Sequence, residues 1–341
     1  MKFYISFDHS DAESRKALPA LTKFLREKKA RFTAERREDE NSETAPEDTD
    51  IIIAFGSSFN VLRTFRKNAD SIIPVLGVSV YSAEFLPEIT LDGFRRLFDR
   101  IIKKEYSIEE RSRMEVEVDG RTLPPVLNDV VIAGQKSAST VAYSVHVDGK
   151  QMFRDEGDGL IVSTPTGSTG YSASSGGPVI LQNSDVISLT PLSSMQQNRP
   201  LVVSGNSLIN IKNAGLSSSL EIVCDGRFRY SSKKGEITVK RYWNPARFAT
   251  INEVRRTPLE KLKNREAMKV ADMEKAPPSA KFIVKLLQYE GPLTQKDIIG
   301  LSSLQIRTVR HGLSYLKNKG VIEEQKSLRD ARYSIYKFKS I

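Results

Sequence analysis

Residues 158–172 of the chain read DGLIVSTPTGSTGYS, and two glycines and a proline follow at positions 176–178. The apolar run from Leu160 to Val162 predicts a buried strand that leads into a turn of small and hydroxyl-bearing residues. Small residues let the backbone approach a ligand closely, and hydroxyl and N–H groups suit ribose, phosphate or base edges. Tyr171 is placed to stack on a base or a nicotinamide ring. The stretch predicts a ligand-binding loop, with an ordinary Ser/Gly surface loop as the alternative.

This stretch lies within a block of predicted strands, residues 106–250. Asp-Gly pairs typical of tight turns divide several of the strands, at positions 119–120, 148–149 and 225–226. Short strands separated by turns predict an all-β lobe. The predicted strands are Met114 to Val118, Val130 to Ile132, Thr140 to Val147, Leu160 to Val162, Leu201 to Val203, Leu208 to Ile211, Leu220 to Val223 and Glu236 to Val239.

Residues 1–105 have a different pattern, in which apolar runs alternate with stretches of helical spacing. Five consecutive apolar residues from Ile51 to Phe55 suit a strand buried on both faces, as in a parallel sheet. The order of elements predicts an α/β lobe. The other predicted elements are strands from Lys2 to Phe7 and from Ile72 to Val80, and helices from Ser14 to Lys28 and from Asn60 to Ala69.

Together these motifs resemble the NAD kinase family. Besides residues 158–172, the chain carries Asn128-Asp129 like the family's Asn-Glu/Asp pair, Asn198-Arg199-Pro200 like its Arg-Pro segment, and Asp225-Gly226 like its Asp-Gly turn. The resemblance implies an α/β lobe, a β-sandwich lobe and bound NAD or NADP, with its ribose hydroxyls on the Asn-Asp pair. The implied nucleotide-binding residues are Gly56, Ser57, Ser58, Asn128, Asp129, Asp158, Thr166, Gly167, Ser168, Thr169, Gly170, Tyr171 and Ser174.

One family motif is altered. Where the family has Gly-Gly-Asp-Gly-Thr, the chain has Gly56-Ser57-Ser58-Phe59-Asn60, so Ser58 takes the place of the Asp that resembles a general base. Loss of a positioned base typically lowers a rate ~10²–10⁴-fold. Phe59 replaces a glycine and is expected to obstruct the approach of ATP phosphates. Residues 81–85 also lack the family's glycines, and Glu84 is expected to repel a triphosphate.

The dinucleotide half of the site therefore looks intact, and the ATP half looks eroded. This pattern predicts a regulator that responds to NAD, NADP or a related adenine nucleotide, with no assigned catalytic residue and little or no kinase activity. The alternative is an active NAD kinase in which Asp129 or Asp158 has become the base. Only that alternative requires ATP and Mg.

A second unit is predicted over residues 279–341, after a charged linker helix at 251–278. It holds 12 Lys/Arg and 5 Asp/Glu, whereas the first 275 residues carry 40 and 37. Apolar spacing predicts helices from Ser279 to Gln288, from Gln295 to Ile299 and from Leu301 to Asn318, and then a hairpin. This order resembles the small α+β winged helix-turn-helix domain of bacterial and archaeal transcription regulators.

The basic balance of the second unit favours DNA, here an operator, as its partner. The third helix is expected to bury Ile306, Val309, Leu313 and Leu316 and to present polar side chains to base edges. A protein-binding module is the alternative. The predicted DNA-binding residues are Gln305, Arg307, Thr308, Arg310 and His311 on the helix, and Arg329 and Arg332 at the tip of the hairpin.

The single cysteine, Cys224, excludes an intrachain disulfide and favours a reduced, cytoplasmic setting. No apolar run approaches the ~20 residues of a membrane span, so no membrane partner is expected. His9 and His146 lie far apart and predict no metal site. The family resemblance implies a homodimer or homotetramer.

Overall fold

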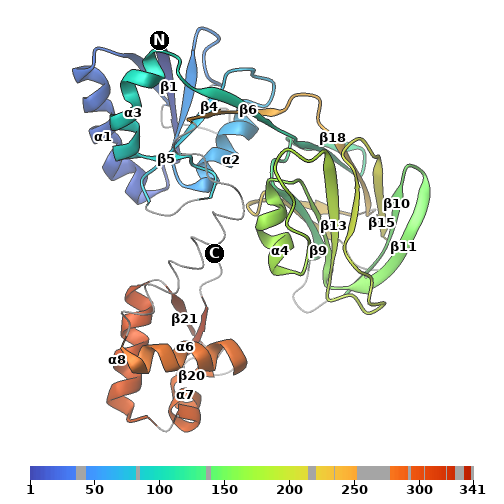
Figure 1. The fold of residues 1–341 in the computed structure, drawn as a ribbon. Coiled ribbons are helices and arrows are strands. Elements are labelled where there is room, and N and C mark those ends of the chain that lie inside the picture. The colour runs from blue at the N-terminus through green and yellow to red at the C-terminus, as the bar shows by residue number, and fades with distance from the viewer. Residues whose placement is uncertain are drawn as a thin grey trace. The chain divides into compact units, whose positions relative to one another are not determined.

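A computed structural model of the 341-residue chain defines the fold. The chain divides into two compact units, Met1–Lys261 and Leu262–Ile341 (Figure 1). The structure describes residues 1–35, 44–81, 85–135, 140–213, 220–233, 235–251, 277–290, 293–302, 304–319, 321–326 and 334–338.

The first unit begins with a seven-stranded sheet in the order β2-β1-β3-β4-β19-β6, with the short β5 paired to β4. Strands β1 to β5 pair in parallel, which confirms the predicted parallel sheet, and β6 runs antiparallel at one edge. The strands are β1 (Lys2–Phe7), β2 (Arg31–Ala34), β3 (Ile51–Gly56), β4 (Val75–Ser79), β5 (Ile89–Thr90), β6 (Ser107–Arg111) and β19 (Ala246–Thr250).

Three helices cover this sheet. Helices α1 (Ala12–Glu27) and α3 (Leu91–Ile102) pack on the face that carries Phe3, and α2 (Ser58–Lys67) packs on the face that carries Tyr4 (Figure 1). Because alternate strand residues point to opposite faces, two apolar clusters form. Both faces are thus covered, and all six residues of β3 are buried, as its sequence predicts.

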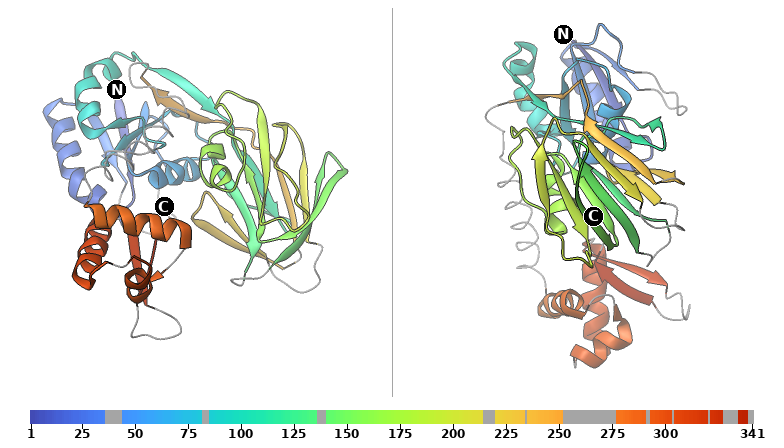
Figure 2. Two further views of the ribbon diagram at one scale, coloured as in Figure 1. Left: turned by 60° about the horizontal axis from the view of Figure 1, so that its bottom comes forward. Right: turned by 90° about the vertical axis from the view of Figure 1, so that its right-hand side faces the viewer.

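The remainder of the first unit is a sandwich of two six-stranded antiparallel sheets, which fits the predicted all-β lobe (Figure 2). The first sheet comprises, in spatial order, β11 (Lys150–Gly157), β10 (Val141–Val147), β15 (Ile209–Asn213), β18 (Glu236–Arg241), β7 (Met114–Val118) and β8 (Arg121–Thr122). The second comprises β14 (Leu201–Ser204), β13 (Val186–Leu192), β12 (Gly159–Ser163), β9 (Asp129–Gly134), β16 (Leu220–Cys224) and β17 (Phe228–Ser232).

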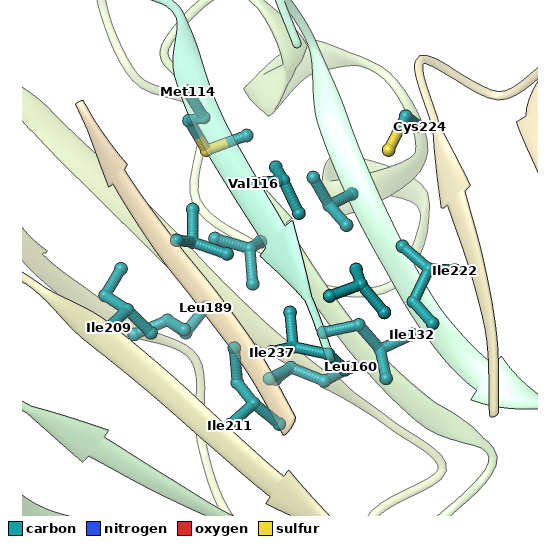
Figure 3. Close-up of a cluster of buried hydrophobic side chains, with 14 of the residues drawn as sticks. Met114, Val116, Ile132, Leu160, Leu189, Ile209, Ile211, Ile222, Cys224 and Ile237 are labelled. Atoms are coloured by element: carbon teal, nitrogen blue, oxygen red, sulfur yellow. The ribbon is translucent and has the colours of Figure 1, made fainter. Parts of the chain in front are cut away.

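Apolar side chains from both sheets interdigitate in one core, to which Met114, Leu160, Ile211 and Cys224 contribute (Figure 3). The predicted Asp-Gly turns lie at the ends of this sandwich. Their aspartates have φ values of 50–52° and their glycines φ values of 68–84°. Both residues of each turn are thus left-handed, as tight hairpins with the twist of the strands require.

Sheet pairing differs from the predicted domain limits in one respect. Strands β6 and β19 fall within residues 106–250 but pair in the sheet of the α/β lobe. The predicted strand from Ile72 begins later, at Val75, and Ile72 is 68% exposed. Strand β2 and helix α3 were not predicted.

The second unit contains three helices and a three-stranded sheet in the order β20-β22-β21. Its elements are α6 (Pro278–Glu290), β20 (Leu293–Thr294), α7 (Gln295–Ser302), α8 (Ile306–Asn318), β21 (Ile322–Lys326) and β22 (Ser334–Phe338). Thr294 caps α7 as predicted, because Thr294 Oγ1 accepts the Asp297 N–H and the Asp297 carboxylate accepts the Thr294 N–H. Val309, Leu313 and Leu316 of α8 lie in the core.

Two predictions about the third helix were wrong. Leu301 and Ser302 belong to α7, which ends at Ser302, and the Ser302 hydroxyl accepts the Leu304 N–H ahead of α8. Ile306, predicted to be buried, is the first residue of α8 and is 53% exposed. Arg329, Arg332 and residues 252–276 of the predicted linker helix lie outside the described residues. In the part of the chain that the structure describes, no helix has the length and apolar character of a membrane span.

Candidate functional site

The loop after β12 is attached to the start of β9. The two strands pair with Ser163 opposite Asp129, so the next residue, Thr164, lies beside Asn128. The Thr164 N–H donates to the Asn128 carbonyl at 2.9 Å, and its hydroxyl donates to the Leu127 carbonyl at 2.6 Å. Sheet pairing therefore brings together the two segments that the sequence placed in one site.

Hydroxyl groups of the loop maintain its shape. The Ser168 hydroxyl donates to the Pro165 carbonyl at 2.8 Å and accepts the Ile180 N–H at 3.0 Å. Thr164 Oγ1 accepts the Gly167 N–H at 3.2 Å. Ser168 was predicted to contact the ligand, but these bonds give its buried side chain a structural role. Thr166 is also buried, at 4% exposure.

Gly167 begins a short 3₁₀ turn, Gly167–Thr169, and Gly170 follows it. A Cβ at Gly167 would lie 2.2 Å from the Asn128 carbonyl oxygen. Only glycine therefore allows the loop to lie so close to β9. The helix α4 (Tyr171–Ser174) follows directly.

Two polar atoms at this junction are buried without a hydrogen-bond partner among the described residues. They are Asn128 Oδ1 and Thr169 Oγ1. They are two of nine such side-chain atoms among the described residues. An unpaired buried polar group costs about 1–3 kcal/mol unless a ligand or water completes its hydrogen bonds. Both atoms come from the residues predicted to hold the nucleotide.

Two buried carboxyl groups lie beside them. Asp225 Oδ1 accepts the Asn128 N–H at 2.7 Å, and Asp225 Oδ2 accepts the Leu127 N–H at 3.3 Å. Burial raises the pKa of Asp129 to about 7, with a further contribution from Asp225, and burial raises the pKa of Asp225 to about 6. No cluster of three metal-ligating side chains occurs among the described residues.

A hollow of about 240 Å³ opens at the outer end of the loop. Tyr171 is 50% exposed there, and Asp158 accepts a hydrogen bond from the Ser193 hydroxyl at 2.5 Å. Ser174 is exposed nearby on α4. The hollow is lined by Asp158, Tyr171, Ser175, Pro191, Leu192 and Ser193. Its aromatic wall and polar rim suit a heteroaromatic ring.

The altered motif lies at the carboxyl end of β3. Gly56 has a φ of 132°, and a Cβ there would lie 2.4 Å from Ser14 Oγ. Ser58 Oγ accepts the N–H groups of Phe85 and Leu86, each at 3.2 Å. These bonds give Ser58 a role in holding the chain before β5. Glu84 lies outside the described residues.

Phe59 extends toward the turn after β16 in the sandwich lobe. A Cβ at Gly226 would lie 3.9 Å from the Phe59 ring, and the Arg227 guanidinium lies 5.9 Å from its centre. Arg227 also pairs with Asp8 at 3.0 Å. The turn 225–227 thus connects the altered motif to the Asn128 loop through Asp225.

Sequence reasoning missed Asp8, Arg66 and Arg227. Arg66 of α2 lies over the Phe228 ring at 3.8 Å and near the Asp225 carboxyl group. None of the three belongs to a motif, so only the tertiary structure reveals their place. The one sequence signal was the position of Arg227, directly after the Asp-Gly turn.

The architecture and this loop define a two-lobed nucleotide-binding domain. Two family models match it, the ATP-NAD kinase N-terminal domain over residues 5–106 and the ATP-NAD kinase C-terminal domain over residues 127–250. The chain belongs to the NAD kinase family.

Relatives and solved structures agree with this assignment. The NAD kinase of Thermococcus kodakarensis is 32% identical over 65% of this chain and 81% of its own length. That of Geotalea daltonii is 36% identical over 56% and 69%. The fold is similar to an NAD kinase from Archaeoglobus fulgidus in complex with ATP (TM-score 0.63, 22% identity, covering 77% of this chain and 96% of that one). It is also similar to yeast NADH kinase complexed with NADH (TM-score 0.63, 19% identity, covering 73% and 83%).

Asp129→Asn is expected to change how stability depends on pH. Because the folded state raises the pKa of Asp129 to about 7, ionisation of this carboxyl group destabilises the fold as the pH rises from about 4 to about 7. The variant has no carboxyl group to ionise at this position. The Tm of the variant minus the Tm of the wild type should therefore increase from pH 4.5 to pH 8. Thermal unfolding across this range is the measurement, with the exposed Asp92→Asn as control. A Tm difference independent of pH would contradict the burial argument.

Proposed function

We propose that this chain binds a dinucleotide of the NAD class in its sandwich lobe. The observation that carries the proposal is the pair of buried, unpaired atoms Asn128 Oδ1 and Thr169 Oγ1, which a ribose can satisfy. The hollow beside Tyr171 then offers a stacking wall for one ring. The solved relatives hold ATP in one case and NADH in the other, which supports nucleotides of this class as ligands.

We further propose that phosphoryl transfer is slow or absent. Ser58 replaces the family's Asp and accepts two backbone N–H groups. A serine hydroxyl is too weak a base near neutral pH to replace a carboxylate. Phe59 and the Asp8–Arg227 pair occupy the approach between the motif and the turn 225–227.

The second candidate is an active NAD kinase, and the names of the relatives from Geotalea daltonii and Thermococcus kodakarensis favour it, because both are NAD kinases. Its base would be Asp129 or Asp158. Asp129 suits the role better, since a pKa of about 7 is matched to proton transfer at neutral pH. In this candidate ATP is the phosphoryl donor, with Mg on its phosphates.

Thr169→Val tests dinucleotide binding. The change removes an unpaired buried hydroxyl at nearly constant volume, so the Tm should not fall. Affinity for NAD should fall about tenfold through loss of one hydrogen bond. Calorimetry measures the affinity. The matched control is Thr64→Val, whose buried hydroxyl donates to the Asn60 carbonyl at 2.7 Å, so that variant should lose stability and keep its affinity. Equal NAD affinity in wild type and Thr169→Val contradicts the proposal.

Ser58→Asp combined with Phe59→Gly tests the kinase question. The double variant restores the family's carboxylate and opens space for phosphates, so the rate of NADP formation from ATP and NAD should rise ~10²-fold or more. Ser58→Ala is the control and should leave the rate unchanged. Fast turnover by the wild type that Asp129→Asn abolishes would establish the second candidate instead.

For the second unit we propose a winged helix that binds DNA. Its helix and strand order agrees with that fold. Gln305, directly before α8, is exposed, as are Arg307, Arg310 and His311 on α8, and Thr308 is partly buried. Exposed Ile306 adds an apolar group suited to a thymine methyl. A nucleotide bound to the first unit would change operator affinity by ~1–3 kcal/mol, a typical coupling. A homodimer or homotetramer in the cytoplasm fits this role.

Arg307→Ala with Arg310→Ala tests this part. Loss of two cations should weaken duplex binding and reduce the slope of log K against log salt by about 1.8, at ~0.9 per phosphate contact. Fluorescence anisotropy at several salt concentrations measures both. Unchanged DNA binding in this variant would favour a protein-binding module.

A further inference from the structure

We propose that the outer face of α1 and α3 is a second DNA-binding surface, which contacts the phosphate backbone of duplex DNA. This inference rests on the proposed DNA binding of the second unit. It assigns a nucleic-acid contact to the α/β lobe, away from the nucleotide loop.

The charge of this face carries the argument. Residues 11–31 and 91–105, which contain the two helices and the turns after them, hold 12 Lys/Arg and 6 Asp/Glu, a balance of +6. The first unit as a whole, residues 1–261, holds 36 Lys/Arg and 34 Asp/Glu, a balance of only +2. The positive charge of the first unit is therefore concentrated on these two helices.

Most of these cations are not neutralised by the protein. Five form ion pairs on the same face, for example Lys28 with Asp99 at 3.4 Å and Arg100 with Glu105 at 3.1 Å. Seven others are exposed and have no carboxylate partner among the described residues. They are Arg15, Arg26, Lys29, Arg31, Arg96, Lys103 and Lys104.

The two helices present one continuous surface. The Phe24 ring lies 6.1 Å from the Phe94 ring and 5.2 Å from the Phe98 ring, so α1 and α3 pack side by side (Figures 1 and 2). Both helices end at the amino edge of the parallel sheet, where Phe98 meets Phe3 at 6.1 Å. Gly56 and its motif lie at the carboxyl edge, so DNA on this face leaves the nucleotide loop open.

The chemistry of the face favours DNA over a membrane. The apolar sides of α1 and α3 are buried against the sheet, and Ile102, at 39%, is the one large apolar side chain exposed on the described residues of these helices. Helices that bind lipid surfaces need apolar side chains for insertion. A surface with a net positive charge matches the repeating phosphates of a duplex.

The test compares two full-length variants with equal loss of charge. The first is Lys29→Gln with Lys103→Gln and Lys104→Gln. The control is Lys150→Gln with Lys212→Gln and Lys233→Gln, three exposed lysines of the sandwich lobe. Anisotropy with a fluorescent duplex of arbitrary sequence, from ~50 to ~200 mM salt, gives the slope of log K against log salt.

The first variant should reduce that slope by about 2.7, at ~0.9 per lost phosphate contact, while the control stays near wild type. An unchanged slope in the first variant, with a reduced slope in Arg307→Ala/Arg310→Ala, overturns this inference and keeps DNA binding by the second unit. If the wild type does not bind the duplex, both this inference and the proposed DNA binding by the second unit are overturned. An equal reduction of the slope in the control variant also overturns this inference. So does a first variant that binds the duplex like the wild type but binds vesicles of anionic lipid more weakly. Thermal unfolding and NAD titration verify that the variants are folded.

Discussion

The site of this protein depends on the buried carboxyl group of Asp225. It accepts the N–H groups of Leu127 and Asn128 and so fixes the start of β9 against the turn after β16. Because β9 also pairs with β12, the same contact positions the loop of Gly167 and Thr169. The turn that carries Asp225 continues to Arg227, which pairs with Asp8 of the α/β lobe. One carboxyl group thus joins the dinucleotide loop to the altered motif.

The two halves of the site have diverged in physical character. In the sandwich lobe, Gly167 lets the loop lie close to the backbone of Asn128. Asn128 Oδ1 and Thr169 Oγ1 have no hydrogen-bond partner among the described residues. At the end of β3, by contrast, Ser58 hydrogen-bonds the backbone and Phe59 reaches across to Gly226. The proposed loss of phosphoryl transfer rests on these contacts of Ser58 and Phe59, although Asn60 Oδ1 in the same motif is also buried without a partner among the described residues.

Local sequence patterns predicted the elements that are strongly apolar or carry turn signals. Strand β3 and the Asp-Gly turns are examples, because burial and left-handed φ values restrict the residue types directly. Strand β11 was missed because it is an edge strand with mostly exposed, polar residues. The interlobe contacts of Asp8, Arg66 and Arg227 were missed because they join segments distant in sequence. The structural hydrogen bonds of Ser168 could not be predicted, because a hydroxyl that binds a ligand and one that holds a loop look alike in sequence.

The central claim is that the sandwich lobe binds an NAD-class dinucleotide while the altered motif no longer supports phosphoryl transfer. Its most direct test is a calorimetric titration of the purified full-length chain with NAD, followed by an assay of the same sample for NADP formation with ATP and Mg. The account predicts saturable dinucleotide binding with little or no NADP. Rapid NADP formation would contradict the claim about the motif, and absence of dinucleotide binding would contradict the claim about the loop.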